Sequence, residues 1–217
     1  DIPFDSTLNY KKQKNLRGRI IVGNINLLTP SKGIEYALEA VSIIAKKLPN
    51  VLYLVIGQTH PVYIQDNGEK YRDMLKKDIK RLNIEKNVRL VNKYLSPSEL
   101  VDWLKVIDFY ITPYLDPQQA ASGALAYAVG AGKCCFSTPY LYAKEVLGDN
   151  RGVLVPFLDS KTIASEVLRL WDNQSEKEII SKNAYDYGRL MTWPNVGLKY
   201  LDLFKTIKTA HKKTRSF

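Results

Sequence analysis

The stretch VLYLVIG at residues 51–57 is apolar at every position before its closing glycine. A strand of a parallel sheet is covered on both faces and is therefore apolar throughout, whereas a strand with one face in water alternates. The apolar residues that come next have the spacing of one helix face: Tyr71, Leu75, Ile79 and Leu82. This segment therefore predicts a buried parallel strand that is followed by a helix.

The same strand-and-helix unit recurs along the chain. Before residues 51–57, an apolar run at 20–23 is followed by a helical stripe between Ile34 and Leu48. After them, short apolar runs predict four more strands, at residues 88–91, 109–112, 134–137 and 153–155. Six strands that alternate with helices predict an α/β fold: a doubly wound, mostly parallel six-stranded sheet with helices on both faces, of the Rossmann-like type.

Capping boxes mark two of the expected helix starts. Ser96 and Glu99, with a proline at the first helical position, predict a helix that begins there. Ser175 and Glu178 have the same spacing and predict a second start. A run of small residues at 120–131 predicts a helix whose backbone approaches its neighbours closely.

The sequence divides into three regions. Residues 1–17 are polar, and we interpret them as a linker or arm from an absent N-terminal domain. Residues 18–193 form the expected Rossmann-like domain. Residues 194–217 are expected to form a closing amphipathic helix and a basic tail, with apolar side chains at Val196, Tyr200, Phe204 and Ile207.

Length and composition are those of an ordinary globular domain. The 217 residues suffice for one sizeable core. No apolar run reaches the roughly 20 residues of a membrane span, and residues 1–5 lack the features of a signal peptide, so we expect a cytoplasmic protein. The two cysteines, Cys134 and Cys135, are adjacent in an apolar run and are expected to be buried and reduced.

The formal net charge of +10 raises the question of an anionic partner. Basic residues of the helix near residue 78 are interleaved with Asp73 and Asp78, as on a solvated face. No base-reading or stacking module is recognisable, so nucleic acid is not expected as a partner. The tail from Lys205 to Arg215 is denser in charge, and two interpretations stay open: a solvated helix end, or peripheral contact with an anionic membrane at its inner face.

Two loops combine the features of a phosphate site beyond the carboxyl ends of the strands, where doubly wound sheets bind ligands. The loop of residues 24–33 delivers Lys32 and a glycine to a helix start, and the loop after residue 112 leads through Ser122 and Gly123 into the small-residue helix. Free N–H groups and the dipole at a helix start favour an anion. A structural interpretation also stays open for each loop: a solvated lysine, and close helix packing.

The sequence contains no pattern typical of a metal site or of a catalytic nucleophile. The two histidines, His60 and His211, lack partners at metal-ligand spacing, so no metal site is expected. No serine has the sequence context of a hydrolase nucleophile. His60 is interpreted as a strand-end loop residue near the cleft rather than as a general base, although its ordinary pKa suits either role.

In order and spacing, these segments resemble the C-terminal domain of the retaining glycosyltransferases called group 1 or family 4, which have the two-domain GT-B architecture. The resemblance covers residues 19–207. It rests on the Lys32-Gly33 pair, on the apolar strand that ends in Gly57, and on residues 92–104, 108–114, 126–133, 145–149 and 151–156. The block SGALAYAVGAGK at 122–133 is also similar to a block in a bacterial subgroup.

The resemblance implies a nucleotide sugar of unknown base as donor substrate, without a cofactor or a metal. Lys32 matches the lysine that stabilises the leaving diphosphate and is the expected catalytic residue. The residues expected to bind the donor diphosphate and sugar are Lys32, Gln119, Ser122, Gly123 and Ala124. Those expected on the nucleoside side are Tyr127, Asn92 and Tyr94.

The sequence departs from the family pattern at the donor site. The usual pair of glutamates, eight positions apart, falls here on Gln119 and Tyr127. The arginine that helps to hold the diphosphate has no match, because Leu27 stands near its place. An amide still hydrogen-bonds sugar hydroxyls, whereas a tyrosine does not reproduce a carboxylate that bridges a ribose diol. An atypical donor, or weak binding of the donor, is the expected consequence.

We therefore expect the donor-binding half of a retaining glycosyltransferase that transfers a hexosyl group to an unknown acceptor. It is expected to be inactive without its N-terminal acceptor domain, on which the closing helix would dock with its apolar face. The alternative is a non-catalytic nucleotide-binding or partner-binding module with a degenerate glycosyltransferase fold.

Overall fold

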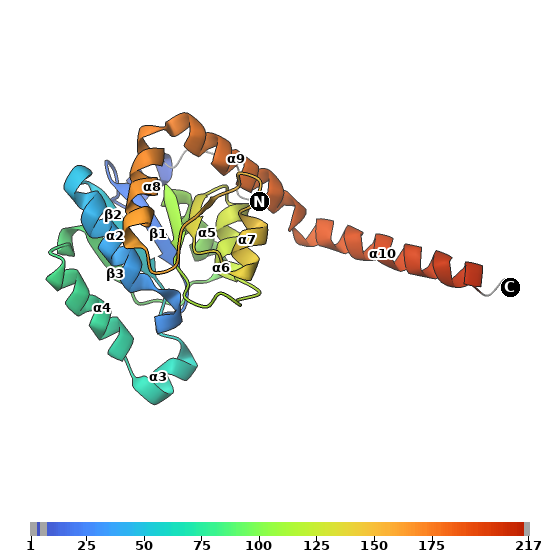
Figure 1. Ribbon diagram of the computed structural model, residues 1–217, viewed down its shortest axis with the longest axis horizontal. Helices are drawn as coiled ribbons and strands as arrows, with labels where there is room; N and C mark the ends of the chain where they lie inside the picture. Colours follow the sequence, from blue (N-terminus) through green and yellow to red (C-terminus); the bar gives the residue numbers. More distant parts are fainter. Residues whose placement is uncertain (1–3, 5–7, 215–217) are drawn as a thin grey trace.

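The computed structural model describes residue 4 and residues 8–214. Its centre is one six-stranded sheet with the order β3-β2-β1-β4-β5-β6, in which every neighbouring pair is parallel (Figure 1). The strands are β1 (Ile20–Ile25), β2 (Val51–Ile56), β3 (Val88–Val91), β4 (Phe109–Thr112), β5 (Cys134–Ser137) and β6 (Val153–Leu154). The doubly wound parallel sheet expected from the sequence is confirmed.

Strand β2 shows why residues 51–56 are apolar throughout. Alternate side chains belong to different cores: Val51, Tyr53 and Val55 pack on one face of the sheet, and the residues between them pack on the other. All six side chains are buried, because β2 lies inside the sheet between β1 and β3. The fully apolar sequence of β2 therefore indicates that helices cover both faces of the sheet.

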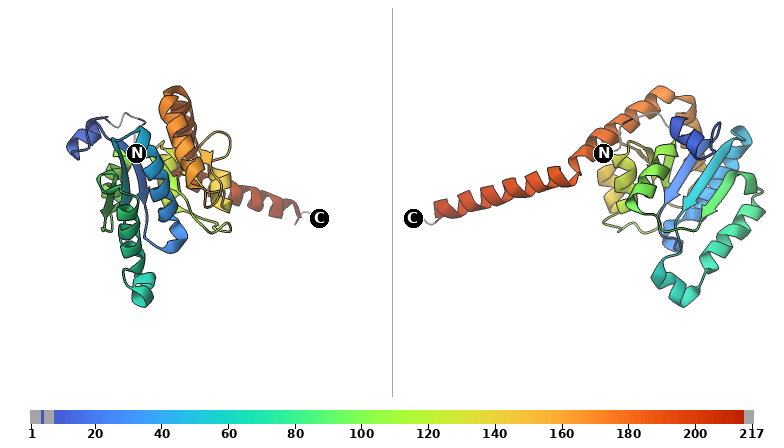
Figure 2. Two further views of the ribbon diagram at one scale, coloured as in Figure 1. Left: turned by 60° about the vertical axis from the view of Figure 1, so that its left-hand side comes forward. Right: turned by 180° about the vertical axis from the view of Figure 1, so that it is seen from behind.

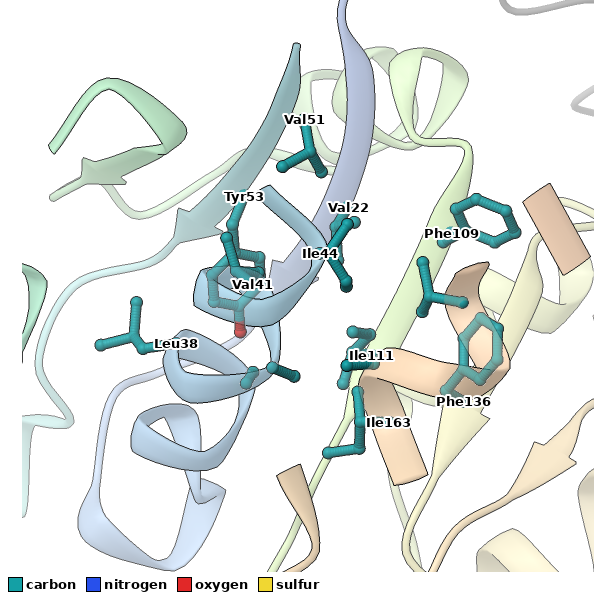
Figure 3. Packing of buried hydrophobic residues seen from close by; sticks show 14 of the residues in the cluster. Val22, Leu38, Val41, Ile44, Val51, Tyr53, Phe109, Ile111, Phe136 and Ile163 are labelled. Atoms are coloured by element: carbon teal, nitrogen blue, oxygen red, sulfur yellow. The ribbon is translucent and has the colours of Figure 1, made fainter. Parts of the chain in front are cut away.

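Helices cover the two faces in two groups (Figure 2). The first core lies beneath α2 (Ile34–Lys47), α4 (Lys70–Arg81) and α8 (Ser160–Asp172). The opposite core lies beneath α5 (Pro97–Val106), α6 (Gly123–Gly130) and α7 (Leu141–Val146). In the first core, Val41 and Ile44 of α2 lie against Val22 and Tyr53 of the sheet (Figure 3).

Shorter elements complete the chain. They are α1 (Leu8–Gln13), the 3₁₀ turns η1 (Pro30–Lys32) and η2 (Glu85–Asn87), α3 (Pro61–Asn67), α9 (Gln174–Leu190) and α10 (Trp193–Thr214). Ion pairs between Lys76 and Asp73 and between Arg81 and Asp78 lie along α4. Cys134 and Cys135 are buried and free, as expected.

The capping signals are confirmed at one helix and wrong at another. At α5, the Ser96 hydroxyl accepts from the N–H of Glu99 (3.3 Å), and the Glu99 carboxylate accepts from the N–H of Ser96 (2.9 Å). At α9 the cap is Asn173 and not Ser175, because the Asn173 side chain accepts from the N–H of Glu176 (3.2 Å). The expected helix at 120–131 begins only at Gly123. Helices α3 and α7 were not expected from the sequence.

Part of the expected N-terminal arm packs on the domain. Lys11 is buried, and its Nζ donates to the Asp108 carboxylate (2.5 Å) and to the carbonyl of Arg19 (3.0 Å). Leu16 is also buried. The carbonyl of Ile107, next to Asp108 in the chain, accepts from the Nζ of Lys133 (3.1 Å). Burial lowers the pKa of Lys133 to about 8.

Helix α10 extends away from the rest of the domain (Figures 1 and 2). Its apolar side chains are exposed, including Tyr200 (58%) and Phe204 (61%). Of the basic tail, Arg215 and the side chains of Lys212 and Lys213 lie outside the described residues. In the part of the chain that is described, no helix combines the length and apolarity needed to cross a membrane.

Candidate functional site

A cleft of about 340 Å³ lies beyond the carboxyl ends of β1, β2 and β4. Since β1 lies beside both β2 and β4, the loops that follow these strands meet at one edge of the sheet. The residues that line the cleft are Asn26, Leu27, Lys32, His60, Tyr114, Gln119, Ala121, Ser122, Gly123 and Ala124. Lys32 and the Ser122-Gly123 turn, singled out from the sequence as features of two separate loops, therefore line the same cleft.

Close packing of two loops fixes the position of Lys32. The N–H of Leu115, after β4, donates to the carbonyl of Ser31, after β1 (3.0 Å). Next to Lys32, Gly33 has a φ of 60°, and a Cβ atom there would lie 2.1 Å from the carbonyl oxygen of Pro113. Only glycine allows both this left-handed conformation and this close approach. The Lys32-Gly33 pair thus combines a charge with the residue that places it.

Lys32 is the charged group of the cleft. Its Nζ lies 4.1 Å from the centroid of the Tyr114 ring, within the range of a cation–π contact. Partial burial lowers the pKa of Lys32 below its ordinary value. A bound anion would favour the charged form and so oppose that shift. The lysine is thus held where an anion would gain most from its charge.

Tyr114 is itself held firmly. Its hydroxyl donates to the Asn26 side-chain oxygen (3.0 Å), and the Asn26 amide donates in turn to the Asn24 side chain. Asn24 donates to the backbone carbonyl of Ile111 (2.7 Å). The Tyr114 ring also stacks on Tyr140, with centroids 5.2 Å apart and an interplanar angle of 13°. This network positions the aromatic surface beneath Lys32.

The start of α6 supplies backbone donors to the same cleft. Ser122 is the N-cap, and its hydroxyl accepts from the N–H of Leu125 (3.2 Å). The N–H groups of the first helical turn have no partner within a helix, and the helix dipole adds positive potential there. No atom lies within 4 Å of the position that a Gly123 Cβ would occupy, so a ligand can approach the backbone. Such a helix start binds phosphate.

Gln119 also lines the cleft, where the resemblance placed it. Its Nε2 donates to the carbonyl of Ala121 (2.9 Å), which orients the side-chain amide beside the start of α6. A neutral amide in this position offers hydrogen bonds to hydroxyl groups but no negative charge. The polar chemistry of the cleft is thus one lysine, one histidine, amides, hydroxyls and backbone N–H groups.

The residues expected on the nucleoside side lie apart from this cleft. Asn92 follows β3, and its side-chain oxygen accepts from Nη2 of the buried Arg72 (2.9 Å). Tyr94 is exposed on the same loop. Tyr127 lines a neighbouring hollow of about 640 Å³, which shares Gly123 with the cleft. The structure thus gathers the expected diphosphate-side residues, and the nucleoside-side roles stay predictions.

Besides Leu27 and Ala121, three lining residues were not expected as ligand contacts: Asn26, His60 and Tyr114. Each follows the carboxyl end of a strand, which is the general signal for ligand contact in this fold. Hydrogen bonds between loops hold these residues at the cleft, through the side chains of Asn26 and Tyr114 and through the backbone of His60. Sequence spacing does not reveal such bonds. Across the described residues, histidine, cysteine and acidic side chains form no group of three that suits a metal ion.

The sequence matches the model of one protein family. That family is described as "Glycosyl transferases group 1", and the match covers residues 6–187, which is most of the chain. Among proteins with curated descriptions, none matches this sequence significantly.

Solved structures show the same fold. The C-terminal domain of a group 1 family glycosyl transferase, LpcC from Francisella tularensis, has a TM-score of 0.75 at 19% identity, covering 89% of this chain and 95% of that one. Sucrose-phosphate synthase from Thermosynechococcus elongatus has a TM-score of 0.79 at 18% identity, covering 95% of this chain and 50% of that one. These likenesses show the fold of a GT-B C-terminal domain.

A third neighbour was solved with a nucleotide. Alr3699/HepE from Anabaena, in complex with UDP, has a TM-score of 0.79 at 17% identity, covering 94% of this chain and 52% of that one. Other structures of it hold UDP-glucose, or UDP with glucose. This chain therefore spans about half the length of the synthase and of HepE.

Proposed function

This chain belongs to the group 1 glycosyl transferases, and from that premise we propose that its cleft binds the diphosphate of a nucleotide sugar for a retaining hexosyl transfer. The observation that carries the proposal is the convergence of Lys32 with the start of α6 on one cleft. Two independent sources of positive potential, an ammonium group and a helix start, then face one anion. The HepE complexes with UDP and UDP-glucose support this class of ligand.

The proposed chemistry places both groups on the leaving side of the reaction. As the bond between the sugar C1 and the diphosphate oxygen breaks, negative charge grows on the nucleoside diphosphate. Lys32 and the N–H groups from Ser122 to Ala124 would stabilise that charge without rearranging, because packing holds them in place. Lys32 is therefore the proposed catalytic residue, and Gln119 would hydrogen-bond the sugar hydroxyls.

We further propose that the acceptor binds to a second domain. The half-length coverage of HepE and the synthase supports this, as does the exposed apolar face of α10, which a neighbouring domain would cover. Transfer requires donor and acceptor to be held together. The 217-residue chain alone should then bind the donor and transfer no sugar, and measurable glycosyl transfer by the purified chain would contradict this.

A thermal-shift screen tests the donor proposal directly. The purified chain is heated with UDP, GDP, ADP, their nucleosides and their glucose or mannose derivatives at a series of concentrations. A ligand that binds only the folded state raises the melting temperature with concentration. At least one nucleoside diphosphate should do so, and its nucleoside should do so much less. If no compound shifts the melting temperature, the proposal is wrong.

One observation favours a second candidate function. Gln119 and Tyr127 stand where the family usually has glutamates, and Tyr127 lies on the neighbouring hollow. A non-catalytic nucleotide-binding module would keep the cleft and would not need the two glutamates. Slow hydrolysis of a nucleotide sugar by the chain would favour the enzyme, whereas tight binding with no hydrolysis, also after a candidate acceptor domain is supplied, would favour the module.

A further inference from the structure

His60 occupies a fixed place in the cleft. Its N–H donates to the carbonyl of Leu28 (3.0 Å), and the N–H of Leu28 donates to the carbonyl of Gln58 (2.9 Å). Leu28 and Thr59 also form a β-bridge. The loop after β2 is thereby tied to the loop after β1, so that His60 lines the cleft together with Asn26.

A second hydrogen bond sets which ring nitrogen is a donor. His60 is the N-cap of α3, and its Nδ1 accepts from the N–H of Val62 (3.2 Å). A nitrogen that accepts carries no hydrogen, so the neutral ring carries its hydrogen on Nε2. Within the described chain, Nδ1 is the one ring atom of His60 with a hydrogen-bond partner. Nε2 is thus left as a donor for a ligand.

The cleft is otherwise poor in donors for an anion with several oxygens. Of the described residues that line it, Lys32 is the one permanent cation. Leu27 is apolar, and the Gln119 amide is engaged by the carbonyl of Ala121. The start of α6 serves one side of the cleft, whereas His60 enters from the loop after β2. A hydrogen-bond donor from His60 would therefore approach an anion from a different loop than Lys32 and the start of α6.

We propose that His60 donates its Nε2–H to an oxygen of the bound nucleoside diphosphate, as a third contact beside Lys32 and the start of α6. This inference rests on the proposed function, because it assumes that the cleft holds a diphosphate. In this role His60 binds the ligand as a neutral ring, and α3 holds the ring in the required tautomer.

Two substitutions separate the donor from the helix cap. Asparagine at this position, His60→Asn, keeps a side-chain acceptor for the N–H of Val62 and is a favourable N-cap, but it lacks a donor at the place of Nε2. Glutamine, His60→Gln, extends an amide N–H to about the reach of Nε2. A hydrogen bond to a charged group contributes about 1.5–3 kcal/mol, which is roughly 10- to 100-fold in affinity.

Isothermal titration of the full chain with UDP and GDP, and with uridine and guanosine, tests the contact. His60→Asn should weaken binding of the diphosphate 10- to 100-fold and leave the nucleoside unchanged, with an unchanged melting temperature of the free protein. His60→Gln should recover most of the affinity. Equal affinity of His60→Asn and the parent chain, or equal loss for nucleoside and diphosphate, would overturn the inference.

The same titration distinguishes this inference from the proposed function. If the parent chain binds neither UDP, GDP nor ADP, the proposed function fails before His60 is considered. A direct readout is the ¹⁵N spectrum of the imidazole rings, which is simple because the chain has two histidines. The His60 Nε2 resonance should shift when UDP or GDP is added, while Nδ1 keeps the signature of an unprotonated nitrogen.

Discussion

The ammonium group of Lys32 lies 4.1 Å from the centroid of the Tyr114 ring, and this contact joins the loop after β1 to the loop after β4. The Tyr114 ring also stacks on Tyr140, and its hydroxyl is hydrogen-bonded to Asn26. The partly buried ammonium group of Lys32 thus contacts the polarisable ring of Tyr114. An anion that enters the cleft meets a charge whose position needs little further ordering.

Replacement of Lys32 by alanine should weaken the binding of a nucleoside diphosphate by about 1.5–3 kcal/mol, the range of a charge-assisted hydrogen bond. Binding of the bare nucleoside should hardly change, and neither should the melting temperature. Isothermal titration measures both affinities. Lys46→Ala, an exposed position on α2, is the matched control. Equal losses for diphosphate and nucleoside would show that Lys32 does not contact the phosphates.

The backbone at Gly33 combines strain with close packing. Gly33 is left-handed (φ 60°, ψ 30°), and a Cβ there would lie 2.1 Å from the carbonyl oxygen of Pro113. A left-handed alanine by itself costs about 1–2 kcal/mol of unfolding free energy. Gly33→Ala should cost clearly more, because Pro113 must also move, and it should weaken nucleotide binding. Urea unfolding measures the loss, and a loss of no more than about 1–2 kcal/mol would contradict the clamp between the two loops.

The buried Lys133 should make stability depend on pH in the alkaline range. Its pKa is about 8 in the folded protein against 10.5 for a free lysine, and burial is the main cause. Between these values the unfolded chain binds more protons, so the contribution of Lys133 to stability rises with pH. The free energy of unfolding of the parent chain, relative to that of Lys133→Met, should therefore rise by on the order of 2–3 kcal/mol between pH 8 and pH 10.5.

Urea unfolding of both proteins at intervals across this pH window gives the difference, and titration of distant groups cancels in it. A difference that stays constant with pH would show that Lys133 titrates alike in the folded and unfolded states.

The outer face of α10 predicts self-association of the isolated chain. Tyr200 and Phe204 are exposed neighbours, with ring centroids 6.2 Å apart. Replacing both by serine should reduce the binding of a hydrophobic dye and any concentration-dependent association, because the exposed apolar area shrinks. The melting temperature should stay the same, since these rings lie away from the core. Sedimentation at several concentrations measures the association, and a large loss of stability would show that α10 packs on the domain.

If the basic tail contacts a membrane, its binding to lipid should depend on salt. Binding to vesicles of anionic lipid should then fall steeply between low and physiological salt, and Lys205→Glu with Lys208→Glu should weaken it. Lys46→Glu with Lys47→Glu changes the net charge equally at a distant site and should have less effect. Binding that ignores salt, or no binding, would leave the tail as a solvated helix end.

The fold was predictable because its signals are local and repeated. Residues 51–56 are apolar on both faces, which is typical of a covered parallel strand, and strands of this kind alternate with helical stripes along the chain. The start of α5 was also predictable, since its cap lies within four consecutive residues. At α9 two cap patterns overlap, and Asn173 rather than Ser175 is used, which spacing alone does not decide.

The candidate site was predictable only in part. Lys32 and Ser122 follow strands that doubly wound topology places side by side, so their meeting could be inferred. The place of His60 depends on hydrogen bonds between its loop and Leu28, which join residues far apart in the sequence. Tyr127 lies on α6, and its side chain lines a hollow shaped by the junction of α9 and α10. Such tertiary arrangements leave no periodic trace in a sequence.

The strand order also affects how the protein folds during its synthesis on the ribosome. Strands β1, β2 and β3 are synthesised first, yet β1 pairs with β4, which emerges later. Until residues 109–112 leave the exit tunnel, β1 is an unpaired edge, and such edges attract other chains. The proposed nucleotide site is likewise incomplete before α6 has been synthesised. A ligand of that site would therefore stabilise the finished domain but would not protect its first half during translation.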